Sequence, residues 1–218
     1  MDGQAYTKFP RTPHLPWSAG GTADDERLMD TAAFTGREVV ALRKMDGENF
    51  TGYPNGFSHA RSLSSGPHPT RDWARAAWGR RAHLLPAGMR VSCENLWAVH
   101  SLAYTDLPGY LLGFAAWDAG NTCLAWDDTV ALFTTLMLPT VEVVWRGTWD
   151  AKTVQALHRP QDDARHEGLV VRLADAFPFD AFARSVAKYV RPKHVQTDRH
   201  WRAGPWTPNG LAPDAMGW

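Results

Sequence analysis

The residues with the clearest chemical potential are a lysine and an aspartate two positions apart. They lie in the tetrapeptide Lys44-Met45-Asp46-Gly47, directly after an apolar run at residues 39–42 that has the pattern of a strand. A lysine placed there would have its amine beside apolar side chains, and burial lowers the pKa of an amine. A neutral lysine is a nucleophile, and a nearby carboxylate can help to place a divalent ion. The alternative is a solvated lysine beside a turn, so the tetrapeptide alone is weak evidence.

Lysine is scarce in this chain, which has 18 arginines and five lysines. A position that keeps lysine is a candidate for a role that arginine cannot fill, such as an amine that loses its proton or a compact positive charge. Chance explains any one lysine equally well. The five positions are Lys8, Lys44, Lys152, Lys188 and Lys193.

Two glutamates occur where strands are expected. Glu167 precedes the apolar stretch at residues 168–171, and Glu94 lies inside a strand pattern at residues 89–97. Glu167 is either the first residue of a turn into a core strand or a carboxylate held at the exposed end of that strand. Glu94 is either an ordinary outward-facing residue or a ligand for ribose hydroxyls or metal-bound water.

Two further segments carry candidate binding residues, one with lysines and one with aromatic side chains. Lys188 and Lys193 could hold phosphates and could lower the pKa of Lys44 by repulsion, although a solvated basic end is the alternative. Residues 110–118 carry aromatics on a predicted strand, where one could stack on a nucleobase. Core packing is the alternative for each of them.

Composition limits the classes of protein that need consideration. The chain has 218 residues, 44% of them hydrophobic, and a net charge of zero, which argues against binding polyanions by bulk charge but permits a local basic groove. Cys93 and Cys123 have no metal-binding spacing and suggest no disulfide framework, so we expect a reducing compartment. No signal peptide or run of about 18 apolar residues is present, so we expect a soluble, cytoplasmic protein without membrane association.

The expected elements mix strands and helices without regular alternation, which favours an α+β fold with largely antiparallel sheets. A hairpin is expected around the Asn55-Gly56 turn, because Asn-Gly is a strong hairpin signal. The predicted strands are residues 37–44, 89–97, 109–117, 141–145, 168–173 and 185–190, with the hairpin at 48–60. The predicted helices are residues 24–30, 70–84, 127–138, 150–158 and 179–184.

Together these segments resemble the covalent nucleotidyltransferase superfamily, which comprises ATP-dependent RNA and DNA ligases and mRNA capping enzymes. The order matches: KxDG, a strand glutamate, an aromatic strand, EGxVxR and a late lysine segment. The resemblance implies a nucleotidyltransferase domain whose sheets flank a nucleotide cleft. About 25 residues follow Lys193, which is too few for the OB domain of DNA ligases and capping enzymes, so none is expected.

By this resemblance, Lys44 is the nucleophile that attacks the α-phosphate of a nucleotide and becomes a lysyl-nucleotide. Glu94 is expected at the ribose or at metal-bound water, and Glu167 is similar to the metal-associated carboxylate of the family. Phe114 resembles the residue that stacks on the base, with Trp117 as the second choice.

Further residues resemble phosphate-binding and branch-specific positions. Lys188 is similar to the phosphate-binding lysine, and Arg191 or Lys193 must replace a second lysine because Val190 occupies its usual position. Asn49 and Arg61 favour RNA ligases. A branch of these enzymes carries Asn at the position of Asn49, and the arginine that corresponds to Arg61 contacts the nucleic-acid end.

The resemblance therefore implies an ATP-dependent RNA ligase that forms lysyl-AMP, adenylylates an RNA 5′-phosphate and seals it to a 3′-hydroxyl, in RNA repair and with a possible repair partner. Mg²⁺ or Mn²⁺ would be held by Asp46, Glu94 and Glu167, largely through water. The alternatives are a DNA ligase, a capping-type enzyme, or a non-catalytic nucleotide- or RNA-binding module. The expected organisation is one nucleotidyltransferase domain, with an N-terminal arm and helix at 1–36, a catalytic core at 37–195 and a C-terminal extension at 196–218.

Overall fold

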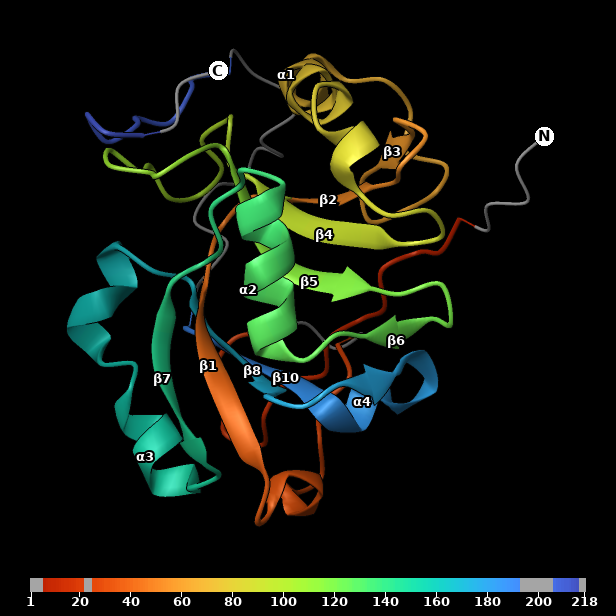
Figure 1. The fold of residues 1–218 in the computed structure, drawn as a ribbon. Helices are drawn as coiled ribbons and strands as arrows, with labels where there is room; N and C mark the ends of the chain where they lie inside the picture. The colour runs from red at the N-terminus through yellow and green to blue at the C-terminus, as the bar shows by residue number, and fades with distance from the viewer. Residues whose placement is uncertain (1–5, 22–24, 193–205, 216–218) are drawn as a thin grey trace.

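A computed structural model describes residues 6–21, 25–192 and 206–215 of the chain. Two antiparallel sheets form its body, with helices against their outer faces (Figure 1). The first sheet has four strands in the order β10-β8-β1-β7, and every neighbouring pair is antiparallel. Its strands are β1 (Glu38–Lys44), β7 (Val143–Thr148), β8 (Gly168–Leu173) and β10 (Val186–Val190).

The second sheet has six strands in the order β3-β2-β4-β5-β6-β9. Its centre is the pairing of β2 with β4 and of β4 with β5, while β3, β6 and β9 have two residues each, with β3 and β9 at the edges. The strands are β2 (Glu48–Gly52), β3 (Ser58–His59), β4 (Arg90–Asn95), β5 (Leu111–Trp117), β6 (Thr122–Cys123) and β9 (Phe177–Pro178).

The helices are short, and most of them connect two strands along the chain. The α-helices are α1 (Pro69–Gly79), α2 (Trp126–Thr135), α3 (Ala151–Ala156) and α4 (Phe182–Ser185). The 3-10 helices are η1 (Ala32–Phe34), η2 (Ala82–Leu84), η3 (Pro160–Ala164) and η4 (Phe179–Ala181). Across the described ranges, every helix is too short or too polar to span a bilayer.

The α+β prediction with antiparallel sheets is confirmed, and so is the order of the main elements. The helix predicted at residues 24–30 is wrong for its described part. Residues 25–30 form no helix, because Leu28 and Glu26 hydrogen-bond to the backbone of His14 instead. The helix predicted at residues 70–84 is divided into α1 and η2.

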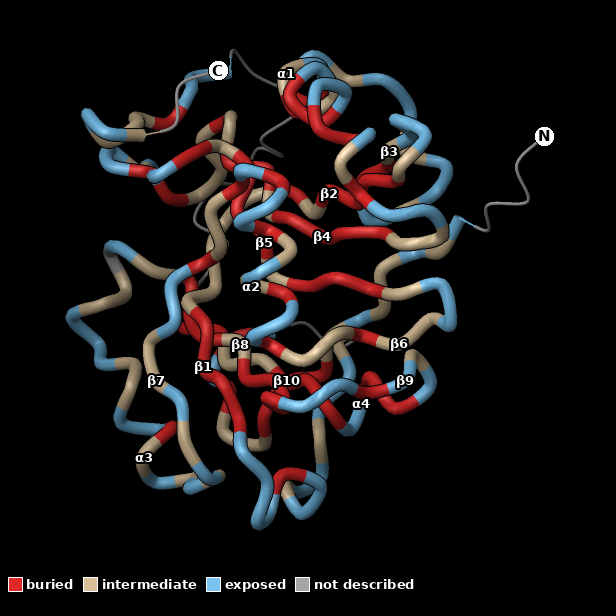
Figure 2. The backbone as a smooth tube through the Cα atoms, in the orientation of Figure 1, coloured by how far each residue is buried: buried red, intermediate tan, exposed pale blue. Residues whose placement is uncertain are grey.

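Burial on both faces explains the unbroken apolar run of β1. Val39 and Ala41 pack in a core between the two sheets, together with Trp117 of β5. The alternate residues Val40 and Leu42 pack in a second core that contains Leu112 and Trp126. Figure 2 shows β1, β4 and β5 as largely buried strands at the centre of the molecule. A residue at the end of β1 therefore emerges from a well-fixed strand.

The second sheet has a further core on its outer face, beneath α1 and α2. Trp78 of α1 is fully buried there, and its indole Nε1 donates a hydrogen bond to the carbonyl of Tyr53. Gly52 is required at this contact, since a Cβ atom there would lie 2.5 Å from the Trp78 ring. Phe133 of α2 packs in the same cluster.

A buried ion pair joins β2 to α1. The Arg71 guanidinium donates through Nε and Nη2 to both carboxylate oxygens of Glu48, and through Nη1 to the carbonyl of Gly66. Both side chains of the pair are less than a tenth exposed. The contact fixes the loop before α1, which carries Arg61, against the sheet.

We expect Glu48→Gln to lower the free energy of unfolding by about 2 kcal/mol, because the buried guanidinium loses its charged acceptor while the side-chain shape is kept. Guanidinium denaturation monitored by circular dichroism measures the change. Asp175→Asn is the matched control, since its pair with Arg37 is exposed and should contribute little. Equal stability of the two variants would contradict the assigned role of the buried pair.

Candidate active site

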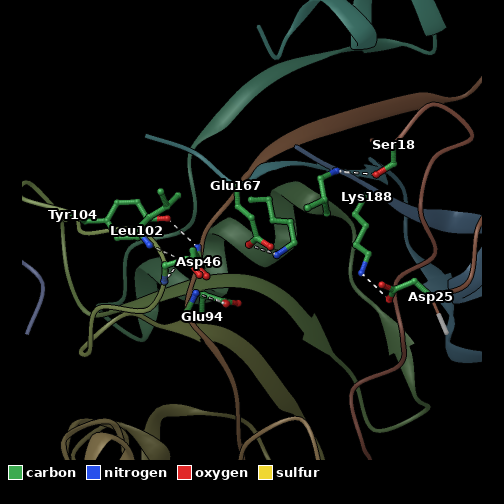
Figure 3. Close-up of polar contacts among 12 residues, drawn as sticks. Ser18, Asp25, Asp46, Glu94, Leu102, Tyr104, Glu167 and Lys188 are labelled. Carbon is green, nitrogen blue, oxygen red and sulfur yellow. Dashed lines mark hydrogen bonds and ion pairs between the residues drawn. The ribbon is translucent and has the colours of Figure 1, made fainter. Parts of the chain in front are cut away.

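Lys44 and Glu167 face each other across two paired strands. Lys44 is the last residue of β1 and pairs in register with Gly168, the first residue of β8. This register brings the Lys44 Nζ atom within 2.5 Å of Glu167 Oε2, to which it donates a hydrogen bond (Figure 3). The Lys44 side chain is 23% exposed and that of Glu167 is 12% exposed, so the pair is partly buried but reachable from solvent.

Gly168 has a conformation that only glycine adopts easily. Its φ is +155°, and a Cβ atom there would lie 2.0 Å from the carbonyl oxygen of Tyr189. The glycine therefore allows β8 and β10 to approach closely just after Glu167. The Glu167 carbonyl also accepts a hydrogen bond from the Arg191 amide. The carboxylate thus has a fixed position at the mouth of the strand, as the sequence predicts.

Asp46 is held by the loop that follows β4. Its Oδ2 atom accepts hydrogen bonds from the amides of Ser101 and Leu102, both at 2.7 Å. Its own amide donates to the Tyr104 hydroxyl at 2.9 Å. These three bonds fix the turn after Lys44 (Figure 3).

Glu94 reaches the same turn from β4. The Gly47 amide donates to Glu94 Oε1 at 3.1 Å. A side chain at Gly47 would not fit, because a Cβ atom there would lie 2.6 Å from the carbonyl of Asn95. Glu94 therefore points inward to the site, which excludes the outward-facing alternative, while its role as a ligand stays a prediction.

Burial and neighbouring carboxylates perturb the pKa values of Glu94 and Asp46. Burial raises the pKa of Glu94 to about 8, with repulsion from Glu167 and Asp46 adding to the effect against the lowering influence of Lys44. Burial and repulsion from Glu167 raise the pKa of Asp46, although the Leu102 and Ser101 amides and Lys44 lower it. The negatively charged forms of Glu94 and Asp46 are therefore destabilised in the absence of a bound cation.

The same carboxylates decide the protonation of the lysine. Burial lowers the pKa of Lys44, as the sequence predicts, but attraction to Glu167, Glu94 and Asp46 outweighs burial and leaves the pKa raised. A lysine that is neutral without ligands is therefore a wrong expectation. Burial and repulsion from Lys44 lower the pKa of Lys188, so the two lysines do repel, but this repulsion does not control Lys44.

The donor chemistry of the site fits a divalent cation held partly through water. The pKa values of Glu94 and Asp46 are raised, and a divalent ion would stabilise the charged form of both carboxylates; oxygen ligands suit Mg²⁺ and Mn²⁺. In the part of the chain that the structure describes, no three acidic, histidine or cysteine side chains form a ready-made metal cage. The Asp46 carboxylate is engaged by backbone amides, so direct ligation by all three predicted residues is not preformed.

Most predicted site residues line one cavity of about 260 Å³. Phe114 is half-buried at its wall, whereas Trp117 is fully buried in the core, so of these two candidates only Phe114 lines the cavity. Lys193 lies outside the described residues. The predicted residues that line the cavity are Lys44, Asn49, Arg61, Glu94, Phe114 and Lys188.

Lys188 lies at the cavity but points to a different partner. Its Nζ atom is 3.6 Å from Asp25 Oδ1, and Figure 3 shows its side chain directed to Asp25 and away from Glu167. A role at the phosphates therefore requires this lysine to turn toward Lys44 when the ligand is present.

Sequence reasoning missed Arg172, the last residue of the EGLVVR motif. This arginine lines the cavity and is almost fully buried, with its guanidinium over the rings of Trp126 and Phe177. Its Nη1 atom has no hydrogen-bond partner among the described residues. The buried strand that carries it was the available signal, since an arginine inside such a strand needs an acceptor.

The C-terminal segment also supports the site, which the sequence did not predict. Asn209 is buried and donates through Nδ2 to the carbonyls of Leu96 and Ala98, while its Oδ1 accepts from the Tyr104 amide. It thereby fixes the loop whose amides hold Asp46. Such a contact between distant segments has no local sequence pattern.

Comparisons with known proteins agree with this geometry. The protein family described as RNA ligase matches residues 37–190. Among curated proteins, none matches the sequence significantly. An archaeal ATP-dependent RNA ligase has a similar structure, with a TM-score of 0.56 and 16% identity over 87% of this chain and 49% of its own.

Two structures of an RNA ligase from Naegleria gruberi are similar as well. An apo mutant has a TM-score of 0.54 and 15% identity, covering 76% of this chain and 53% of its own. A mutant with ATP and Mn has a TM-score of 0.54 and 13% identity, covering 84% of this chain and 60% of its own. This chain thus spans about half the length of these solved structures, and the likeness concerns the fold.

Proposed function

This chain belongs to the RNA ligase family, and from that premise we propose that it is an ATP-dependent RNA ligase. The observation that carries the proposal is the Lys44 amine beside Glu167, at a cavity that also presents an aromatic wall and cations. A nucleotide fits this arrangement, with its base against Phe114 and its phosphates toward Lys44. A module that only binds nucleotide has no need of a strand-end amine among three carboxylates.

The first proposed step forms the lysyl-AMP intermediate. The Lys44 Nζ lone pair attacks the α-phosphorus of ATP, a P–N bond forms, the bond to the bridging oxygen breaks and pyrophosphate leaves. The lysine must first lose the proton that its carboxylate neighbours stabilise, and Glu167 is hydrogen-bonded to that amine. Mg²⁺ or Mn²⁺, when bound near Asp46, Glu94 and Glu167, would offset both phosphate charge and carboxylate charge.

The later steps return the lysine and join the strands. An oxygen of the RNA 5′-phosphate attacks the AMP phosphorus, the P–N bond breaks and Lys44 is released. A 3′-hydroxyl then attacks the activated 5′-phosphorus and AMP leaves. Arg61 is exposed at the rim of the cavity and is the candidate for holding a strand end. Cytoplasmic location, a role in RNA repair and a repair partner stay predictions from the sequence.

Intact-mass measurement after incubation with ATP and Mg²⁺ tests the proposal. We expect the protein to gain one AMP, and a parallel incubation with GTP to give no adduct. Nicked duplexes with RNA or DNA strands then separate an RNA ligase from a DNA ligase. No adduct would favour the binding module, a GMP adduct would favour capping-type chemistry, and sealing of DNA alone would favour a DNA ligase.

A further inference from the structure

The N-terminal segment, residues 6–21, lies outside the stretch that matches the family but is built into the fold. It runs beside β10 and forms an isolated parallel β-bridge with it, between His14 and Lys188. The Lys188 amide donates to the carbonyl of Pro13, and the Leu15 amide donates to the carbonyl of Lys188. The Gly20 amide donates to the carbonyl of Val190 in the same way. The segment therefore has a defined position beside the cavity.

The beginning of this segment forms part of the cavity wall. Phe9, Pro10 and Thr12 line the cavity. The Phe9 ring lies 5.3 Å from that of Phe114, at an angle of 87°, and 5.4 Å from that of Phe182, at 85°. Phe9 thus stands perpendicular to the aromatic residue assigned to the nucleobase, and it is half-buried with part of its surface open.

A later residue near the same segment contacts another residue that lines the cavity. Asp25 lies 3.6 Å from Lys188 Nζ, and its second oxygen lies 3.6 Å from His14 Nε2. The N-terminal region therefore contacts two residues that line the cavity, Phe114 through Phe9 and Lys188 through Asp25. This dual contact is more than a surface loop needs for its own packing.

We propose that Phe9 is a specificity-determining residue of the nucleotide pocket, an inference that rests on the proposed function. Two perpendicular aromatic rings form a rigid corner for a planar base. The Phe9 ring presents no hydrogen-bonding group, so a base with additional polar groups at that edge would lose hydration without compensation. Phe9 thereby favours adenine over guanine and confines the base against Phe114.

Binding measurements with α,β-methylene-ATP and α,β-methylene-GTP test this inference, because neither analogue can transfer its nucleotide to a lysine. We expect Phe9→Ala to weaken binding of the ATP analogue about tenfold and to reduce the preference for it over the GTP analogue. Phe9→Leu keeps an apolar side chain and should retain more of that preference. Unchanged affinities, or tighter binding by Phe9→Ala, would overturn the inference.

The control is Phe57→Ala. Phe57 is similarly aromatic and packs on Tyr6 of the same segment, with ring centroids 4.1 Å apart, but it is not among the residues that line the cavity. A change that only loosens the segment should therefore leave the preference between the two analogues unaltered. An equal loss of preference in Phe57→Ala would attribute the effect to loosening and overturn a specific role for Phe9.

Limited trypsin digestion of the wild-type protein adds a readout that needs no variant. Cleavage after the exposed Arg11 should be slowed by the ATP analogue, because a base held against Phe9 restrains the neighbouring backbone. Absence of protection at saturating analogue would contradict the inference. If the wild-type protein binds the analogue but forms no adduct with ATP, the proposed ligase function fails while the pocket assignment stands; if it binds neither analogue, the assignment of Phe9 is overturned.

Discussion

Lys44→Ala should abolish transfer of AMP to the protein, and Lys44→Arg should fail as completely. Alanine removes the amine that forms the P–N bond, and the arginine guanidinium stays protonated in proteins and so cannot act as the nucleophile. Loss of an essential nucleophile commonly lowers the rate by about 10⁴-fold or more, which is below detection in a labelling experiment. Incubation with ATP labelled at the α-phosphorus, followed by denaturing electrophoresis, measures the transfer.

The matched control for this experiment is Lys152→Ala, which removes an exposed lysine of α3 that is not among the residues lining the cavity. It should label like the wild-type protein. Circular dichroism must show that the Lys44 variants are folded, since Lys44 also makes an ion pair with Glu167. Label that persists on Lys44→Ala would place the nucleophile elsewhere and reject the assignment.

Local patterns in the sequence predict much of the fold, for identifiable reasons. Residues 39–42 and 168–171 are continuous apolar runs because β1 and β8 are buried on both faces, and the Asn55-Gly56 turn marks its hairpin. The strands β6 and β9 have only two residues each, so no periodic pattern can reveal them. Residues 25–30 resemble a helix start in sequence, but pairing with the distant His14 takes precedence.

The site was predictable where a residue type and a strand end coincide, as for Lys44 and Glu167. It was not predictable where function depends on contacts between distant segments, as for Ser101 and Leu102 at Asp46 or for Asn209. The predicted direction of the Lys44 pKa shift was wrong for a related reason. Burial can be inferred from an apolar run, but the summed attraction of three carboxylates depends on where the chain brings them together.

Glu167→Gln should slow the formation of lysyl-AMP by about 10²-fold, and it should also move the rise of the rate with pH to lower pH. The rate falls because a carboxylate that helps to hold the divalent ion is lost. Burial lowers the pKa of Lys44, and Glu167 is the strongest of the groups that raise it. Since the neutral amine is the reactive form, the wild-type rate should rise with pH, and removing Glu167 should move this rise to lower pH. Single-turnover measurements across pH separate the maximal rate from the position of the rise.

Glu142→Gln is the control, because it removes the same charge from a residue that pairs with Arg43, next to Lys44 in the chain, at 3.1 Å. Glu142 is exposed and is not among the groups that shift the pKa of Lys44, so both the maximal rate and the pH dependence should be unchanged. A loss of rate in Glu167→Gln without any shift of the rise would mean that Glu167 acts on the ion alone. An unchanged maximal rate would show that Glu167 has no role in the reaction. Glu94 and Asp46 would then be the carboxylates that act on Lys44.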